Sequence, residues 1–221
     1  MDIYEAINNR HSVRSYLDKR IPDEIVAELL LEIKKCNEES GLNLQLVTNE
    51  PKAFSGVLAH YGKFVNVKNY IALVGKKDKD LDEKLGYYGE RIVLKSFMMG
   101  LDTCWVGATY SKSKCACEVN PGEILRGVIS IGYGENKGKP HKNKPLEKLC
   151  KVEGPMPDWF LSGMKAAMLA PTAVNQQKFL FTLKGNTIKA EETGGFYSKM
   201  DLGIVKYHFE IGAGMDNCKW I

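Results

Sequence analysis

The sequence has no apolar run long enough to cross a bilayer, because the longest runs, such as 71–75 and 97–101, fall far short of roughly 20 residues. It also has little net charge, since 31 Lys and Arg against 27 Asp and Glu give +4, far below the excess on a dedicated nucleic-acid-binding face. Residues 1–10 are acidic and polar, without the charged-then-apolar layout of a signal peptide. We therefore expect a cytoplasmic protein that binds neither a membrane nor a nucleic acid.

The sequence also lacks the cysteine spacing of a disulfide framework or a zinc site. Its six cysteines are scattered over 221 residues, and a chain of this length does not depend on disulfides for stability. Cys115 and Cys117 form a Cys-x-Cys pair, but no second Cys or His pair lies at the spacing that a zinc site requires. We expect reduced thiols and no metal.

What the sequence does contain is ordinary for one globular domain, with 44% hydrophobic and 26% charged residues. Apolar residues at helical spacing, with Pro and acidic residues at one start and Gly100 at one end, predict helices. Unbroken apolar runs predict buried strands. The expected helices are 2–9, one from 23, 81–100, one from 159 and 200–214, and the expected strands are 42–47, 69–75, 125–134 and a pair within 179–191. Because helices and strands do not alternate strictly, the fold class is α+β.

The sequence also shows a weak internal repeat. Residues 84–105 resemble 200–220, and residues 29–47 share a helix, turn and strand rhythm with 164–182. Two amphipathic helices can align by chance, but several identities at one constant offset favour duplication. The aligned pairs are Gly89 with Gly203, Gly100 with Gly214, Asp102 with Asp216 and Cys104 with Cys218. We predict one domain over 1–221, made of a first repeat at 1–150 and a shorter second repeat at 155–221.

Four stretches carry residues suited to binding a ligand. Arg10, His11, Ser12 and Arg14 offer charged and hydroxyl donors, which phosphate monoesters prefer, although a solvated basic turn has the same composition. Residues 170–179 run from a helix through Pro171, Thr172 and Asn175, whose polar groups could face a planar ligand or form an ordinary loop. Val106 and Gly107 lie where a backbone could approach a flat ligand closely, or in a plain buried strand. Lys142 and Lys144 precede Pro145.

Taken together, these stretches resemble the FMN-dependent nitroreductase family over nearly the whole chain. The matching motifs are Arg10-His11-Ser12-Val13-Arg14, Gly100-Leu101-Asp102-Thr103-Cys104-Trp105-Val106-Gly107, Lys142-Asn143-Lys144-Pro145-Leu146 and Ala170-Pro171-Thr172-Ala173-Val174-Asn175-Gln176-Gln177. The resemblance implies a nitroreductase-like fold with a mixed central sheet flanked by helices.

One motif is displaced from its usual position in that family. In the family, the Pro-Ser-x-x-Asn stretch follows the arginine cluster by a few tens of residues, and two subunits enclose the FMN. Here residues 34–43 lack the Pro and the matching Asn, and the motif lies in the second repeat, which lacks an arginine cluster. The resemblance thus implies a single-chain pseudo-dimer with one flavin site per chain, able to bind flavin as a monomer.

The resemblance also assigns roles to the residues. The charge of the phosphate would be balanced by Arg10, Lys142 and Lys144. The phosphate, the ribityl chain or the ring edge would be bonded by Ser12 and Arg14. His11 would be a positioning residue rather than an acid. Val106 and Gly107 would face the ring through their backbone, and Pro171, Thr172 and Asn175 would close the site; Asn66 is the remaining cofactor contact.

The implied activity is an NADH- or NADPH-dependent reduction of a nitroaromatic, a quinone or a similar planar small-molecule acceptor, with no catalytic side chain needed besides the cofactor. A flavin-binding redox sensor or carrier is the alternative, because Lys178 and Phe179 replace the family's usual Pro-Trp.

Overall fold

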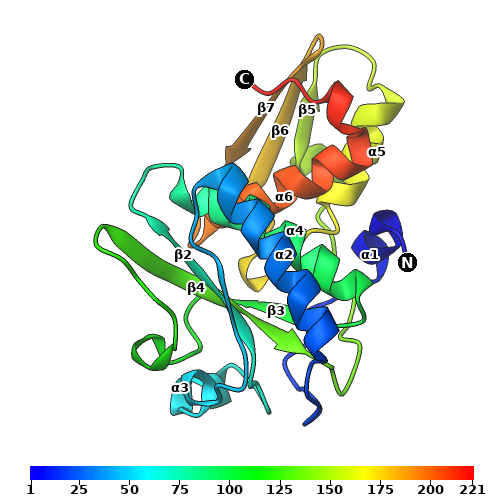
Figure 1. Cartoon of the computed structure of the whole chain (residues 1–221). Helices are drawn as coiled ribbons and strands as arrows, with labels where there is room; N and C mark the ends of the chain where they lie inside the picture. Colours follow the sequence, from blue (N-terminus) through cyan, green and yellow to red (C-terminus); the bar gives the residue numbers. More distant parts are fainter. The chain divides into compact units, whose positions relative to one another are not determined.

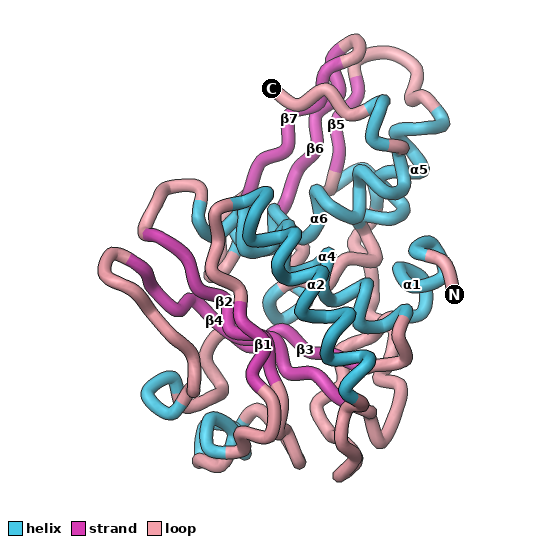
Figure 2. Tube along the Cα trace, in the orientation of Figure 1, coloured by secondary structure: helices cyan, strands magenta, loops and turns pink.

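The computed structural model describes all residues 1–221. It contains six α-helices and seven strands, drawn in Figures 1 and 2. The helices are α1 (Ile3–Asn9), α2 (Asp23–Ser40), α3 (Val57–Tyr61), α4 (Leu81–Met98), α5 (Asp158–Ala167) and α6 (Ser198–Ala213). The strands are β1 (Gln45–Val47), β2 (Tyr70–Lys76), β3 (Asp102–Val106), β4 (Glu123–Gly132), β5 (Cys150–Val152), β6 (Phe179–Lys184) and β7 (Thr187–Glu192).

This arrangement confirms the α+β class. The strands are divided between two sheets, one with the order β1-β2-β4-β3 and one with the order β5-β6-β7. Every neighbouring pair in the larger sheet is antiparallel, and only the smaller sheet is mixed, with β5 parallel to β6. Short elements that have little sequence periodicity, α3 and β5, were not predicted. No helix combines the length and the apolar character that a bilayer-spanning segment needs.

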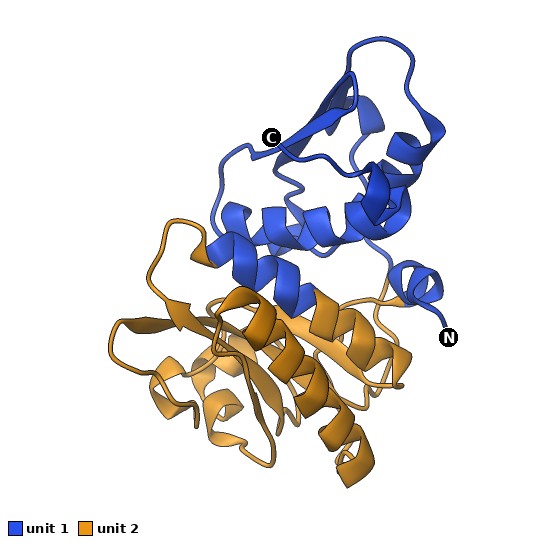
Figure 3. Ribbon diagram, turned by 45° about the horizontal axis from the view of Figure 1, so that its top comes forward, with its two compact units in different colours: residues 1–9, 82–90, 140–221 blue, residues 10–81, 91–139 orange.

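The chain divides into two compact units, shown in Figure 3. Unit 1 consists of residues 1–9, 82–90 and 140–221, and unit 2 of residues 10–81 and 91–139. Each unit contains one of the two sheets. Helix α4 supplies residues to both units, because its first half belongs to unit 1 and its second half to unit 2.

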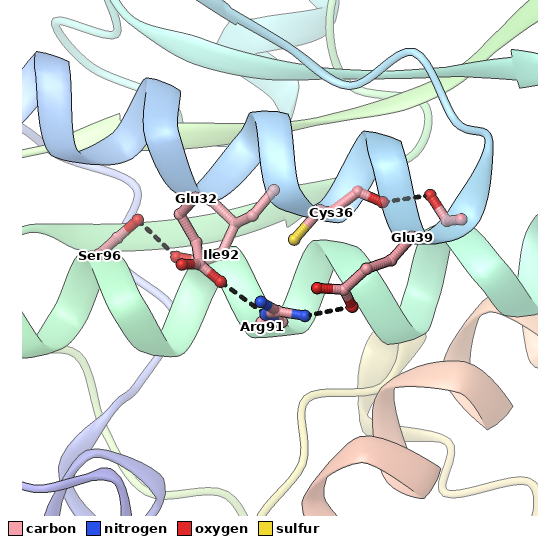
Figure 4. Close-up of polar contacts among 7 residues, drawn as sticks. Glu32, Cys36, Glu39, Arg91, Ile92 and Ser96 are labelled. Carbon is pink, nitrogen blue, oxygen red and sulfur yellow. Dashed lines mark hydrogen bonds and ion pairs between the residues drawn. The ribbon is translucent and has the colours of Figure 1, made fainter.

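Unit 2 is built on β2 and β4, whose residues are almost all buried. Residues of α2 are tied to the second half of α4 through Arg91, shown in Figure 4. The Arg91 guanidinium donates to Glu32 Oε1 at 2.6 Å and to Glu39 Oε2 at 2.7 Å. Burial raises the pKa of the neighbouring Cys36 thiol to about 12. Cys36 is therefore a protonated, inert core residue.

Unit 1 has an aromatic core between its sheet and two helices. Phe181 of β6 stacks on Phe209 of α6 with ring centroids 4.8 Å apart, and Phe209 also contacts Phe160 of α5 and Trp220. Trp220 pairs with Ile188 of β7 in a parallel bridge. Such rings bury large apolar areas, so this cluster stabilises the unit.

Two glycines let α4 and α6 cross at very short range within unit 1. A Cβ atom at Gly86 would lie 2.0 Å from the carbonyl oxygen of Met200, and one at Gly203 would lie 1.9 Å from that of Glu83. In both cases the contacted residue precedes the opposite glycine by three positions (86 − 83 and 203 − 200). The contact is therefore reciprocal, as in a helix pair related by a two-fold axis.

Candidate functional site

The arginine cluster of unit 2 follows α1 and runs beside β3. Ser12 forms a parallel bridge with Thr103, and the Val13 backbone N–H donates to the Thr103 carbonyl at 3.0 Å. Arg10 is 3% exposed, whereas Arg14 is exposed. The pairing with β3 fixes the direction of the segment, so one guanidinium lies inside the unit and the other reaches solvent.

The electrostatics of Cys104 show where these side chains converge. Burial raises the pKa of the Cys104 thiol, while the charges of Arg14 and Arg10 and the Ser12 hydroxyl act in the opposite direction. All three groups therefore lie close enough to β3 to stabilise negative charge there. The two cations and the hydroxyl donor thus lie near the buried sulfur of Cys104.

Glycines bring the backbone close to the same region. A Cβ at Gly138 would lie 2.8 Å from both His11 Cβ and the Ser12 carbonyl oxygen. A Cβ at Gly127 of β4 would lie 3.0 Å from the carbonyl oxygen of Val106. Val106 ends β3 and is buried, and Gly107 follows it without a side chain. Gly107 itself therefore carries no side chain that would block the predicted approach of a flat ligand to this backbone.

Asn66 follows Val65, whose backbone is hydrogen-bonded to the segment that carries the arginine cluster. The Val65 N–H donates to the Arg14 carbonyl at 2.9 Å, and the Val65 carbonyl accepts from Tyr16 N–H at 3.1 Å. Asn66 itself has φ 55°, in the left-handed region, and lines a polar pocket with Tyr16 and Lys68. Six of the seven predicted site residues of unit 2 thus lie on β3 or on segments next to it, whereas Asn66 faces a pocket that contains none of the other six.

The loop from Pro171 to Gln177 carries the remaining motif and lies in unit 1. Pro171 is buried after α5, and the Thr172 hydroxyl accepts from Gln177 N–H at 3.1 Å. Three residues without glycine's freedom have positive φ, namely Val174 at 45°, Asn175 at 55° and Gln177 at 44°. Such conformations cost free energy and persist only where the surroundings hold them.

Gln177 is the main support of this loop, and it was not predicted. Its buried amide accepts from Lys144 N–H at 2.9 Å through Oε1 and donates to the Lys142 carbonyl at 2.9 Å through Nε2. Nε2 also donates to Asn175 Oδ1 at 2.8 Å, and Asn175 Nδ2 donates to the same Lys142 carbonyl at 2.9 Å. The amides join the two predicted stretches into one cluster.

The two lysines contribute differently from each other. The Lys144 ammonium donates to the carbonyls of Gln176 at 2.6 Å and Gln177 at 2.9 Å, so in this structure it fastens the loop. Burial, followed by the nearby charges of Lys178 and Lys148, lowers the pKa of Lys144. Lys142 contributes its carbonyl to the cluster and is exposed. Phosphate binding by either side chain stays a prediction.

Asp201 is a second residue that the sequence analysis missed. It is 3% exposed in the first turn of α6, and its carboxylate accepts from Ala173 N–H at 3.0 Å and from Gln176 Nε2 at 2.8 Å. The sequence does contain one signal for it, since Asp201 lies three and four positions before Ile204 and Val205 and so shares an apolar helix face with them. A buried carboxylate needs partners, and here they come from the motif loop.

The sequence as a whole was compared with known families. A family model described as "Putative TM nitroreductase" matches residues 2–213. The chain belongs to this nitroreductase family. No curated protein matches it. The family assignment agrees with the resemblance drawn from the motifs, and it makes the chain a member of a group of oxidoreductases.

Solved structures share the nitroreductase fold of this chain. A "putative nitroreductase" of Thermotoga maritima has 24% identity and a TM-score of 0.68, with 98% of this chain and 85% of that chain covered. A "putative nitroreductase in complex with FMN" from Desulfovibrio desulfuricans has 20% identity and a TM-score of 0.55, covering 71% of this chain and 99% of that chain. A "Putative NADH dehydrogenase/NAD(P)H nitroreductase" of Bacteroides thetaiotaomicron has 19% identity and a TM-score of 0.54, with 66% and 95% covered.

Proposed function

We propose that this nitroreductase binds one FMN per chain and uses NADH or NADPH to reduce a small planar acceptor, such as a nitroaromatic or a quinone. The observation that carries the proposal is the pairing of Ser12 with Thr103 of β3, which brings Arg10, Ser12 and Arg14 near Cys104. The two charges and the hydroxyl act to lower the pKa of the Cys104 thiol, which supports a site suited to negative charge. FMN in complex with the Desulfovibrio desulfuricans protein of the same fold supports the choice of cofactor.

The donors in unit 2 fit a flavin mononucleotide. Two guanidiniums and a hydroxyl match the charge and the acceptor oxygens of a phosphate monoester. The backbone at Val106 and Gly107 has no side chain between it and a flat ring at position 107. When bound, FMN supplies the hydride-accepting ring of the reaction. The protein's part is to hold the phosphate, orient the ring and leave room for the acceptor.

We also propose that the chain is an internally duplicated pseudo-dimer. Two stretches have the same order of elements, apart from α3 between β1 and β2: α2, β1, β2, α4 and β3, and then α5, β6, β7, α6 and the Trp220 segment. β1 and β2 form an antiparallel pair, as do β6 and β7. The reciprocal Gly86 and Gly203 contacts are those of symmetry-related helices. The match covers 99% of the Desulfovibrio chain but only 71% of this one. This chain therefore contains residues beyond those that match a whole nitroreductase chain.

The cofactor and the turnover are tested together by the visible spectrum of the purified protein. We expect a yellow protein with about one FMN per chain, since the sequence has one arginine cluster and one Pro-Thr-x-x-Asn loop. Anaerobic NADH or NADPH should bleach the flavin, and a quinone or nitroaromatic should restore its colour over many cycles. Bleaching without sustained turnover would assign the chain to the sensor or carrier class, and two flavins per chain would exclude the pseudo-dimer.

The flavin-binding residues are tested by a set of alanine variants. Arg10→Ala should weaken FMN binding by about 2 kcal/mol, because a charge-assisted contact to phosphate is lost. Arg14→Ala is the companion variant, since Arg14 is exposed and its loss leaves the core intact. Lys34→Ala, on the exposed face of α2, is the control and should bind FMN like the wild type. Fluorescence titration with FMN measures all four proteins, and equal affinity throughout would place the flavin elsewhere.

A further inference from the structure

The strained stretch of the motif loop is not held by its own side chains. Val174 has φ 45° and ψ 28° although it is β-branched, and its side chain is 81% exposed. An exposed valine gains little from packing, so nothing at this residue offsets the cost of the left-handed conformation. The restraint must come from the residues on either side.

Asp201 supplies that restraint on both sides. Its Oδ1 and Oδ2 lie 3.0 and 3.1 Å from the N–H of Ala173, just before Val174. Its Oδ2 also accepts from Gln176 Nε2 at 2.8 Å, beyond Asn175. One buried carboxylate therefore bonds the chain at both ends of the strained residues.

The turn beyond the loop is shaped to receive Gln176. Nε2 of Gln176 donates its second hydrogen to the Phe196 carbonyl at 2.9 Å. A Cβ at Gly195 would lie 2.4 Å from Gln176 Oε1, and Gly195 has φ 107°. Only glycine fits this position. The amide is thus fixed between the turn and Asp201, and its orientation requires an acceptor at Asp201.

Few ionisable groups face Asp201. The loop from 170 to 177 carries none, and α6 and the turn before it carry Tyr197 and Lys199 nearby. Glu192 is bonded to Ser198 Oγ and Gly194 N–H. In the first turn of α4, which packs at Met200, the charged residues are Asp82, Glu83 and Lys84, and Glu83 pairs with Lys206. The causes of the Asp201 pKa include no charge interaction with any of them.

We propose that Asp201 is a positioning residue whose ionised carboxylate holds residues 173–177 in their strained conformation, so that protonation of Asp201 releases the loop and weakens flavin binding. The flavin part of this proposal rests on the proposed function and on the sequence-based expectation that the Pro-Thr-x-x-Asn loop contributes to flavin binding. The loop part depends only on the contacts described above. A protonated or amide side chain has one acceptor fewer for Ala173 and Gln176.

The titration of Asp201 falls in a useful range. Burial raises its pKa from 3.8 to about 6, while the bonds from Gln176 and Ala173 act to lower it. A raised pKa in the folded state means that the neutral form favours folding, and this contribution is lost as the pH rises from about 4 through about 6. Above pH 6 the ionised Asp201 therefore lowers global stability while it orders the loop. These two effects have opposite signs, which a purely structural residue would not show.

The experiment compares the wild type, Asp201→Asn, Gln176→Ala and the control Asp216→Asn, whose carboxyl group is exposed. At pH 8 we expect Asp201→Asn to unfold at a higher urea concentration than the wild type, with the difference closing by pH 4. At the same pH its Ala173 amide should exchange with deuterium about tenfold faster, since a charge-assisted bond is lost. Gln176→Ala should also speed the deuterium exchange of the Ala173 amide, but it should not unfold at a higher urea concentration than the wild type.

FMN titration from pH 5 to 8 supplies the second measurement. The FMN phosphate itself titrates near pH 6, but it does so equally in all four proteins. We therefore expect the ratio of dissociation constants, Asp201→Asn over wild type, to be about 10 at pH 8 and to approach 1 at pH 5. Asp216→Asn should give a ratio of 1 throughout.

Each result decides part of the proposal. A pH-independent ratio, or unchanged protection of the Ala173 amide in Asp201→Asn, overturns it. Loss of both stability and flavin binding in Asp201→Asn would make Asp201 a structural residue only. If the wild type binds no FMN at all, the proposed function fails, and the amide exchange alone then decides whether Asp201 holds the loop.

Discussion

The links that join α2 to β1 and α5 to β6 occupy the same place in the two similar stretches, yet they are built differently. After α2 the chain turns at Gly41, with φ 72°, and its N–H donates to the Asn37 carbonyl at 2.8 Å. Asn37 then fixes Leu44 through two bonds of 2.8 and 3.0 Å. Glycine adopts this conformation at little cost, so the first link is a relaxed helix cap.

The second link reaches its strand through strained residues instead. Val174, Asn175 and Gln177 have positive φ, and Gln177, Lys144 and Asp201 hold them by side-chain bonds. A turn that served only to reverse the chain would not need such support. The contrast is the one expected if the chain is the proposed pseudo-dimer with one flavin site, in which only the second link has a binding role.

The comparison assumes that the α4–α6 crossing relates the two stretches. Substitutions at this crossing should have the largest effect on stability. Gly86→Ala and Gly203→Ala should each lower the free energy of unfolding by about 3 kcal/mol or more, because each new Cβ meets a backbone oxygen that cannot move alone. Urea unfolding measures the loss. Helix propensity alone would stabilise both variants by about 1 kcal/mol, so a loss can come only from the crossing.

Because the crossing is reciprocal, the sizes of the two losses can also be compared. The two variants should lose similar amounts, whereas Lys199→Ala, at an exposed position of α6, should stay within about 0.5 kcal/mol of the wild type. A large loss at one glycine and none at the other would separate the two helices from any two-fold relation.

The side chains that hold the two links can be removed in parallel. Gln177→Ala should cost about 2 kcal/mol of unfolding free energy, because Gln177 is 3% exposed and its loss removes a partner of the Lys142 carbonyl and of the Lys144 N–H. Asn37→Ala should cost about 1 kcal/mol, since Asn37 is only half-buried. Thermal or urea unfolding measures both. An equal cost at the two positions would argue against the extra support of the second link.

The smallest effect concerns two exposed valines. Val174→Gly should stabilise the protein by about 0.5 to 1 kcal/mol, because the left-handed strain is relieved and little packing is lost. Val57→Gly, at an equally exposed valine in helix α3, should instead destabilise it by about 0.5 kcal/mol. Denaturation curves of the two variants should shift in opposite directions. Destabilisation by Val174→Gly would show that the conformation of the loop is not strained.

Much of the fold could be predicted because local patterns determine it. Apolar spacing placed α2, α4, α5 and α6 close to their observed bounds, and the buried runs placed β2 and β4. The register of the repeat was harder. The alignment set Gly89 opposite Gly203, whereas the reciprocal packing relates Gly86 to Gly203. A shift of about one helical turn leaves the same face apolar, so periodicity cannot distinguish the two registers.

The candidate site could be predicted only where a motif marks it. The arginine cluster and the Pro-Thr-x-x-Asn loop have recognisable residue order, and the structure brings each set together within its own unit. Gln177 and Asp201 have no such mark, because their roles depend on partners 33 and 25 to 28 positions away in the sequence. Nothing local in the sequence shows that Lys144 donates to two carbonyls rather than to solvent.

The discontinuous make-up of unit 1 has a consequence for synthesis on the ribosome. All of unit 2 has been translated once residue 139 is made, so its sheet can form early. Unit 1 also contains residues 1–9 and 82–90, which are translated before residues 140–221. They cannot pack into unit 1 until α6 and Trp220 have been translated. Ala6 and Ile7 of α1, buried in the finished protein, therefore stay uncovered for most of translation. Helix α1 is therefore a segment that a chaperone or a protease could bind before unit 1 is complete.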